Sequence, residues 1–202
     1  TNTMSTVITL KDLNFNVNIS EAMRYIGAAG GNDTLQILVQ DAVNNFKKIA
    51  TPLGCYIRLP IKVTNDTVDF GFAITKSKSL AKNLKACNYA FIFAVTLGVG
   101  VDLALNRSLL TSPSEAVILD AVGSAAVEGL ANSLNDLLEN QAGQSLRPRF
   151  SPGYGDFDLS FQRQIITLLD THRKIGLSLT DGLMLTPTKS ITAIVGIPNQ
   201  EI

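Results

Sequence analysis

In the first fifty residues, stretches in which apolar residues recur with the period of a helix are separated by short polar or glycine-rich segments. Apolar residues recur at intervals of three and four over 20–27, which predicts a helix with Ser20 as its N-cap. A second run with the same spacing follows Asn32 and Asp33, either of which can cap it, and continues toward Pro52. The chain is therefore expected to open with a pair of helices.

Other stretches are rich in β-branched and aromatic residues. A short strand is expected over 6–10, and the segments 56–63 and 67–73 flank three polar residues, as in an antiparallel hairpin. Strands are also expected over 89–96 and 190–196.

Helical spacing returns in the middle of the chain and after residue 159. A helix is expected over 101–109, and a long one over 112–140 contains Gly123 and Gly129. Two glycines inside a helix cost about 2 kcal/mol relative to alanine, so we expect another backbone or a flat ligand to approach closely. A shorter helix is expected over 160–169.

The order of these elements predicts an α+β fold, with a mostly antiparallel sheet flanked by helices. A chain of 202 residues with 46% hydrophobic residues has enough apolar material for one sizeable core. We therefore expect a single domain.

Composition narrows the classes of partner and site. Seventeen basic residues balance seventeen acidic ones, so neither nucleic acid nor a membrane surface is expected as a partner. The apolar run 89–101 is shorter than the roughly 20 residues of a membrane-spanning helix and is expected to be a buried strand.

Cys55 and Cys87 are expected to be free, buried thiols, and His172 to lie at a solvated helix end. With no secretion signal recognised, the expected location is cytoplasmic.

One loop, 149–156, combines groups suited to ligand recognition. Arg149 can hold a carboxylate with two parallel hydrogen bonds, Gly153 leaves its backbone groups accessible, and Tyr154 offers a flat ring face. A small, partly charged ligand would suit these groups. The alternative is a structural turn in which Arg149 pairs with a surface acid.

The residues Arg-Phe-Ser-Pro-Gly-Tyr over 149–154 resemble the adenosylmethionine-binding loop in the activation domain of vitamin B12-dependent methionine synthase. Ile-Gly-Leu-Ser-Leu-Thr-Asp over 175–181, Met184, and Pro-Thr-Lys-Ser-Ile-Thr over 187–192 resemble later motifs of that domain in order and nearly in spacing. The resemblance implies a stand-alone domain of this kind over 1–202, with an N-terminal helical and hairpin part over about 1–110 and a ligand-binding part over about 111–202.

The resemblance also implies a binding site for S-adenosylmethionine. It places Arg149 on the methionine carboxylate, with Gly153 and Tyr154 lining the site and Ser151 in the same loop. No residue is expected to act as an acid or base, because alkyl transfer from a sulfonium requires no proton transfer.

The long helix departs from the family pattern. The family has a ligand-binding acid one turn after the aspartate that matches Asp120, and this chain has Ser124 there. Glu128 lies a further turn along the same helix face and is the candidate replacement, so both residues belong to the expected site.

The implied role is accessory. Such a domain supports reductive methylation of the corrinoid of a cobalamin-dependent methionine synthase or related methyltransferase and is not a self-sufficient enzyme. The chain has no Asp-x-His-x-x-Gly corrinoid motif, so a corrinoid-binding methyltransferase protein would bring the cobalamin and a flavodoxin-type donor the electron. The alternative is a corrinoid-protein interaction module that has lost adenosylmethionine binding.

Overall fold

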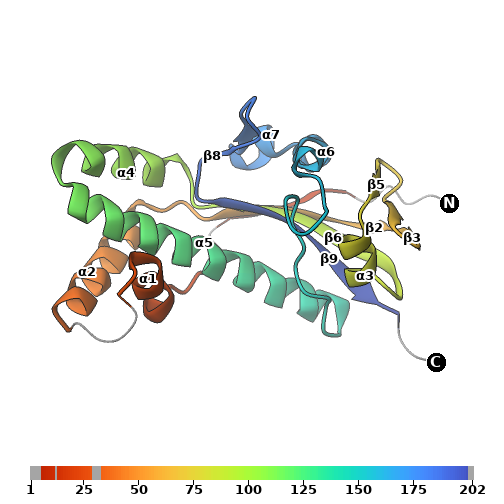
Figure 1. Cartoon of the computed structure of the whole chain (residues 1–202), viewed down its shortest axis with the longest axis horizontal. Coiled ribbons are helices and arrows are strands. Elements are labelled where there is room, and N and C mark those ends of the chain that lie inside the picture. The colour runs from red at the N-terminus through yellow and green to blue at the C-terminus, as the bar shows by residue number, and fades with distance from the viewer. Residues whose placement is uncertain (1–5, 12, 29–32, 200–202) are drawn as a thin grey trace.

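The computed structural model describes residues 6–11, 13–28 and 33–199. Within these residues, four strands form the main sheet, and two small sheets and seven α-helices surround it (Figure 1). The strands are β1 (Ile8–Lys11), β2 (Leu53–Pro60), β3 (Lys62–Thr64), β4 (Thr67–Asp69), β5 (Ile74–Lys76), β6 (Cys87–Thr96), β7 (Ser178–Leu179), β8 (Leu185–Thr186) and β9 (Ser190–Pro198). The helices are α1 (Ile19–Ile26), α2 (Asp33–Ile49), α3 (Lys78–Asn83), α4 (Val99–Thr111), α5 (Pro113–Ala142), the 3-10 turn η1 (Leu159–Phe161), α6 (Gln162–Leu169) and α7 (Thr171–Ile175).

The main sheet has the strand order β1-β2-β6-β9, and its strand pairs within the described residues are all antiparallel. Strand β6 is central. Its alternate residues Phe91, Phe93 and Val95 join one hydrophobic core, and Ala90 and Ile92 join the other. Because both faces of β6 are covered over 90–95, these residues are all apolar and buried, which confirms a buried strand there. The end of the expected run is different, because Val99 to Val101 form the first turn of α4. The expected α+β fold with an antiparallel sheet is confirmed.

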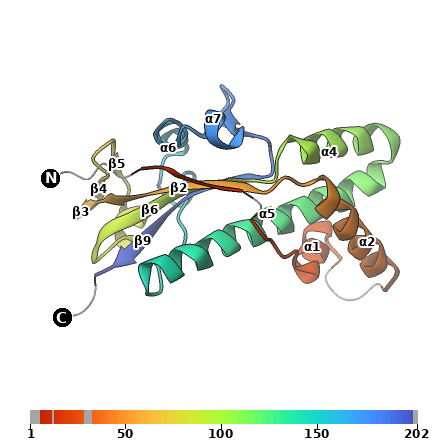
Figure 2. The ribbon, with the colours of Figure 1, turned by 180° about the vertical axis from the view of Figure 1, so that it is seen from behind.

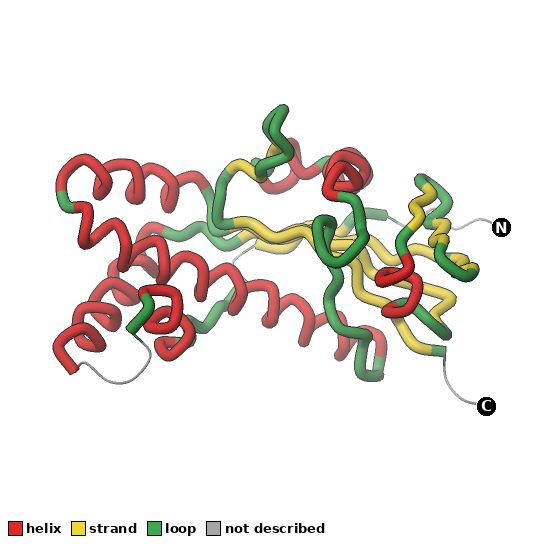
Figure 3. Tube along the Cα trace, viewed as in Figure 1, coloured by secondary structure: helices red, strands yellow, loops and turns green. Residues whose placement is uncertain are grey.

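Helices cover both faces of the sheet. Figures 1 and 2 show α5 lying along one face with α1 and α2 beside it, whereas α6 and α7 lie on the opposite face. The loop after α5 brings the chain across the edge of the sheet, from one helical layer to the other (Figure 3). The cavity described below lies under this loop.

Helix α5 begins where expected, with Pro113 in its first turn, and ends at Ala142, two residues later than expected. Gly143 follows in the left-handed conformation that commonly ends a helix. Within the described residues, α5 alone is long and apolar enough to cross a membrane, and half of its most apolar window is buried. A core helix covered by neighbours has the same composition, and α5 packs on β6 and β9.

The two glycines inside α5 both lie under close neighbours. A Cβ at Gly129 would lie 1.9 Å from the carbonyl oxygen of Asn16, and one at Gly123 would lie 2.9 Å from Cε of Lys189. At Gly129 another backbone approaches, as expected. At Gly123 the neighbour is a side chain of the same protein.

Three local expectations are wrong. The side chain of Asn18, not of Ser20, caps α1 by accepting a hydrogen bond from the backbone N–H of Glu21. The expected hairpin of strands 56–63 and 67–73 is shorter, because β2 ends at Pro60 and the short β3 forms the hairpin with β4, which ends at Asp69 and pairs next with β5. The helix expected from residue 160 begins as the 3-10 turn η1, and Asp158 accepts a hydrogen bond from the N–H of Ser160.

The cysteines and the histidine lie as expected. Cys55 and Cys87 are free and buried, and burial raises the pKa of the Cys55 thiol to about 12. His172 is exposed on α7, where Nδ1 lies 2.9 Å from Oγ of Ser178. The described residues contain no cluster of potential metal ligands.

Candidate functional site

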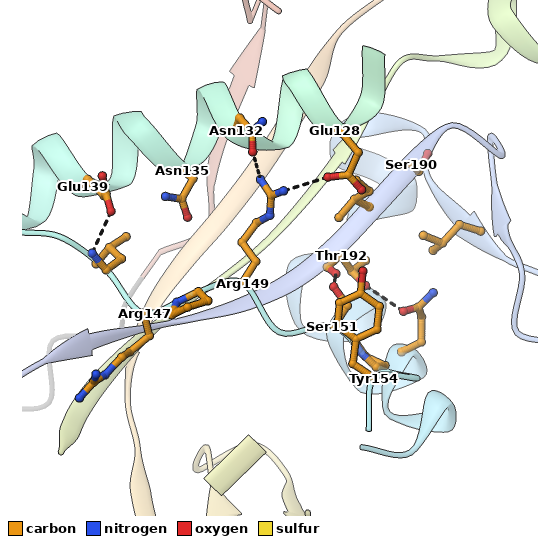
Figure 4. A pocket seen from close by; sticks show the side chains of 16 residues that line it. Glu128, Asn132, Asn135, Glu139, Arg147, Arg149, Ser151, Tyr154, Ser190 and Thr192 are labelled. Atoms are coloured by element: carbon orange, nitrogen blue, oxygen red, sulfur yellow. Dashed lines mark hydrogen bonds and ion pairs between the residues drawn. The ribbon is translucent and has the colours of Figure 1, made fainter. Parts of the chain in front are cut away.

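A cavity of about 600 Å³ lies between α5, β9 and the loop after α5 (Figure 4). The loop is held on the edge of the sheet, because Phe150 forms a two-way backbone bridge with Ile194 of β9 and the N–H of Arg147 bonds the carbonyl of Gly196. The cavity is lined by Glu128, Asn132, Asn135, Glu139, Leu146, Arg147, Pro148, Arg149, Ser151, Pro152, Tyr154, Gln162, Leu185, Ser190, Ile191 and Thr192.

Helix α5 contributes a stripe of four polar residues. Glu128, Asn132, Asn135 and Glu139 follow one another at intervals of four, three and four, so they share one face of the helix. Glu139 accepts a hydrogen bond from the N–H of Leu146 and holds the start of the loop. The other three leave carboxylate and amide groups on the cavity wall.

Arg149 reaches from the loop toward this stripe (Figure 4). One terminal nitrogen donates to the carboxylate of Glu128 at 2.9 Å and the other to Oδ1 of Asn132 at 2.8 Å. The side chain of Arg149 is 22% exposed and that of Glu128 45%, so the pair lies at the mouth of the cavity. A guanidinium has five N–H donors, and these two bonds leave donors for a ligand.

The rest of the loop shapes the cavity with a ring and a hydroxyl. Tyr154 is 57% exposed and packs edge-to-face on Phe150, which leaves its ring accessible. Ser151 lines the cavity and donates its hydroxyl proton to the carbonyl of Thr192 at 2.7 Å. The N–H of Gly153 bonds the carbonyl of Phe157, so Gly153 holds the turn and does not line the cavity.

Asp156 fastens this loop to α3. Its carboxylate accepts hydrogen bonds from the hydroxyl of Ser77 at 2.6 Å and from the N–H groups of Lys78 and Ser79 at 2.8 and 3.0 Å. These bonds, led by that of Ser77, hold the pKa of Asp156 well below its usual range. The carboxylate therefore stabilises the fold in its charged form.

We expect Asp156→Asn to lower the melting temperature at neutral pH, because the amide cannot accept all three bonds. The folded pKa lies below the unfolded value of 3.8, so the stabilisation is present above that pH and is lost as the pH falls toward the folded pKa. Thermal melts of both proteins should therefore converge in acid. Asp41→Asn, an equal charge change on the exposed face of α2, is the control and should leave the melting temperature nearly unchanged. A constant gap between wild type and Asp156→Asn down to pH 3 would contradict this assignment.

Ser124 lies outside the cavity and is bonded to Lys189. Nζ of Lys189 donates to the carboxylate of Asp120 at 2.8 Å and to the hydroxyl of Ser124 at 3.0 Å. The family pattern has a ligand-binding acid at the position of Ser124. In this chain the ammonium of Lys189 lies against that position.

Four of the expected site residues line one cavity: Glu128, Arg149, Ser151 and Tyr154. Sequence reasoning missed Asn132 and Asn135, although their helical spacing from Glu128 was a usable signal. It also missed Gln162, whose side chain bonds the hydroxyl of Thr192. No local pattern marks Gln162, because its position depends on how α6 packs on the sheet.

The arrangement can bind a zwitterion. A guanidinium and a carboxylate lie side by side at the cavity mouth, so a carboxylate and an ammonium on one ligand can each meet the opposite charge. These groups can bind such a ligand and hold it in one position.

Comparisons with known proteins bear on the fold. No family model matches the chain, and no curated protein matches it. Among solved structures, the chain is similar to the MetH reactivation domain bound to AdoHcy, with a TM-score of 0.77 and 14% sequence identity. The match covers 98% of this chain and 80% of that one. The expectation of an activation-domain-like fold is confirmed: the chain has the fold of the methionine synthase reactivation domain.

Proposed function

We propose that this chain binds S-adenosylmethionine and supports reductive methylation of a corrinoid held by a partner, a cobalamin-dependent methionine synthase or related methyltransferase. Arg149 binds the carboxylate of the methionine moiety, and Glu128 binds its ammonium. Tyr154 provides a ring face for the adenosyl part or the sulfonium. The sulfonium supplies the methyl group, and the protein contributes position and exclusion of water. A flavodoxin-type donor supplies the electron.

The observation that carries the proposal is the Arg149–Glu128 pair at the mouth of the cavity. The 2.9 Å pair joins the loop that resembles the adenosylmethionine-binding loop to the helix that carries the candidate ammonium ligand. The similar structure was solved with AdoHcy, the demethylated form of S-adenosylmethionine, which supports the same class of ligand.

Calorimetric titration of the wild-type chain with S-adenosylmethionine, S-adenosylhomocysteine and 5′-methylthioadenosine tests the proposal. The first two carry the zwitterionic head and should bind. Methylthioadenosine keeps the adenosine and the sulfur but lacks the head, and losing two charge-assisted contacts should weaken its binding by at least about tenfold. Equal affinity for all three would show that Arg149 and Glu128 do not bind the amino-acid head. Absence of binding by all three would contradict the proposed function.

A corrinoid-protein interaction module without adenosylmethionine binding is the second candidate. The observation that favours it is that Glu128 and Asn132 both accept hydrogen bonds from Arg149, so the charged groups of the cavity mouth satisfy one another. This candidate predicts docking of a corrinoid protein with an affinity that does not change when S-adenosylmethionine is added. Titrating a corrinoid protein with and without the ligand separates the two functions.

A further inference from the structure

The guanidinium of Arg149 is held on α5 at two points (Figure 4). One terminal nitrogen donates to the carboxylate of Glu128 at 2.9 Å, and the other donates to Oδ1 of Asn132 at 2.8 Å. The two acceptors are four residues apart, which is about 6 Å along the helix axis, so they are neighbours on one helix face. A single bond would let the guanidinium pivot, whereas two bonds fix the direction of its remaining N–H groups.

The end of Arg149 has open space around it, so these bonds decide where it points. Glu128, Asn132 and Arg149 line the ligand cavity and also a hollow of about 720 Å³ between α5 and the segment 16–25. Asp136, one turn beyond Asn132, lines this hollow but not the ligand cavity, and its carboxylate has no hydrogen bond or ion pair within the described residues. A guanidinium released by Asn132 therefore has room, and a carboxylate, to move toward on the side away from the ligand cavity.

The two acceptors on α5 differ in charge. Under the proposed function Glu128 pairs with Arg149 and also binds the ammonium of the ligand, which attracts its carboxylate and weakens its hold on Arg149. Asn132 is neutral, so its amide oxygen accepts from Arg149 without competing, as a second carboxylate would, with the carboxylate of the ligand. The bond from Arg149 to Asn132 can therefore stay in place when the ligand binds.

We infer that Asn132 is a positioning residue that holds Arg149 in the orientation in which its guanidinium meets the ligand carboxylate. The inference rests on the proposed function, in which Arg149 binds that carboxylate. A guanidinium has five N–H donors, and the two bonds to α5 leave three for other partners. Donors that are already fixed in direction bind more tightly, because less side-chain freedom is lost on binding. Asn132 acts through Arg149 and does not itself contact the ligand.

Calorimetric titration of Asn132→Ala with S-adenosylhomocysteine and 5′-methylthioadenosine tests the inference. Affinity for S-adenosylhomocysteine should fall about three- to tenfold, the effect of one hydrogen bond. Methylthioadenosine has no carboxylate, so its affinity should stay within about twofold of the wild-type value. Asn132 is exposed and alanine favours helices, so the variant should fold. Asn140→Ala removes the same amide from an exposed position of α5 outside the cavity, and this matched control should bind both ligands as wild type does.

A double-mutant cycle separates positioning from direct contact with the ligand. Because Asn132 acts through Arg149, adding Asn132→Ala to Arg149→Ala should change the affinity for S-adenosylhomocysteine by less than about twofold. A further loss of about three- to tenfold in that background would show that Asn132 contacts the ligand itself, and the inference would be wrong.

The outcomes distinguish this inference from the proposed function. If wild type prefers S-adenosylhomocysteine to methylthioadenosine and Asn132→Ala keeps the full preference, the inference fails while the proposed function stands. The same conclusion follows if Asn132→Ala weakens both ligands equally, because the effect is then on the structure of the site as a whole. If wild type binds neither compound, the proposed function fails and the inference fails with it.

Discussion

Arg149→Ala is expected to weaken S-adenosylmethionine binding by about 10- to 100-fold, because hydrogen bonds to a charged group contribute about 1.5–3 kcal/mol. The substitution removes the proposed carboxylate ligand and also leaves Glu128 unpaired beside the ligand carboxylate. Both changes weaken binding of the ligand. Calorimetric titration of the purified variant measures the loss.

Two variants make this result specific. Arg149→Lys keeps the charge but cannot form two parallel hydrogen bonds, so its affinity should lie between those of wild type and Arg149→Ala. Arg107→Ala removes the same charge from the exposed surface of α4, away from the cavity, and should bind as wild type does. Wild-type affinity in Arg149→Ala would show that the ligand does not use this loop.

Much of the fold follows from local patterns, and the exceptions have physical causes. Strand β6 and helix α5 were predictable, because the first is apolar on both faces and the second has a proline at its start and a glycine after its end. The end of β2 at Pro60 was not, because it depends on pairing with β6, a strand remote in sequence. The α1 cap depended on which of two cap-forming residues, Asn18 or Ser20, reaches a free N–H group.

Part of the candidate site was likewise predictable from local patterns, and part depends on tertiary packing. The loop from Arg149 to Tyr154 was recognisable as a candidate site because its residue types and order resemble a known ligand-binding loop, and Glu128 followed from helical spacing. The position of Lys189 was not predictable, since nothing local indicates that its side chain crosses to Ser124. That contact depends on the distance between α5 and the segment before β9, which the packing of the core sets.

Gly129→Ala is expected to destabilise the protein by about 1–3 kcal/mol, even though alanine favours helices over glycine by about 1 kcal/mol. The added Cβ would lie 1.9 Å from the carbonyl oxygen of Asn16, and backbone cannot rotate away as a flexible side chain can. Either α5 or the segment before α1, which contains Asn16, must move. The free energy of unfolding from urea titration measures the loss.

The same displacement should reach the ligand site, because Glu128 is the neighbour of Gly129 on α5 and forms half of the charged pair at the cavity mouth. We therefore expect Gly129→Ala to weaken S-adenosylmethionine binding as well as folding. Gly182→Ala is the matched control: its added Cβ has no neighbour nearer than 3.9 Å, so stability and affinity should both stay near wild type. If Gly129→Ala is as stable as wild type, the two backbones do not approach as closely as the structure indicates. If it is destabilised but binds normally, the position of α5 relative to the segment around Asn16 does not control the Arg149–Glu128 pair.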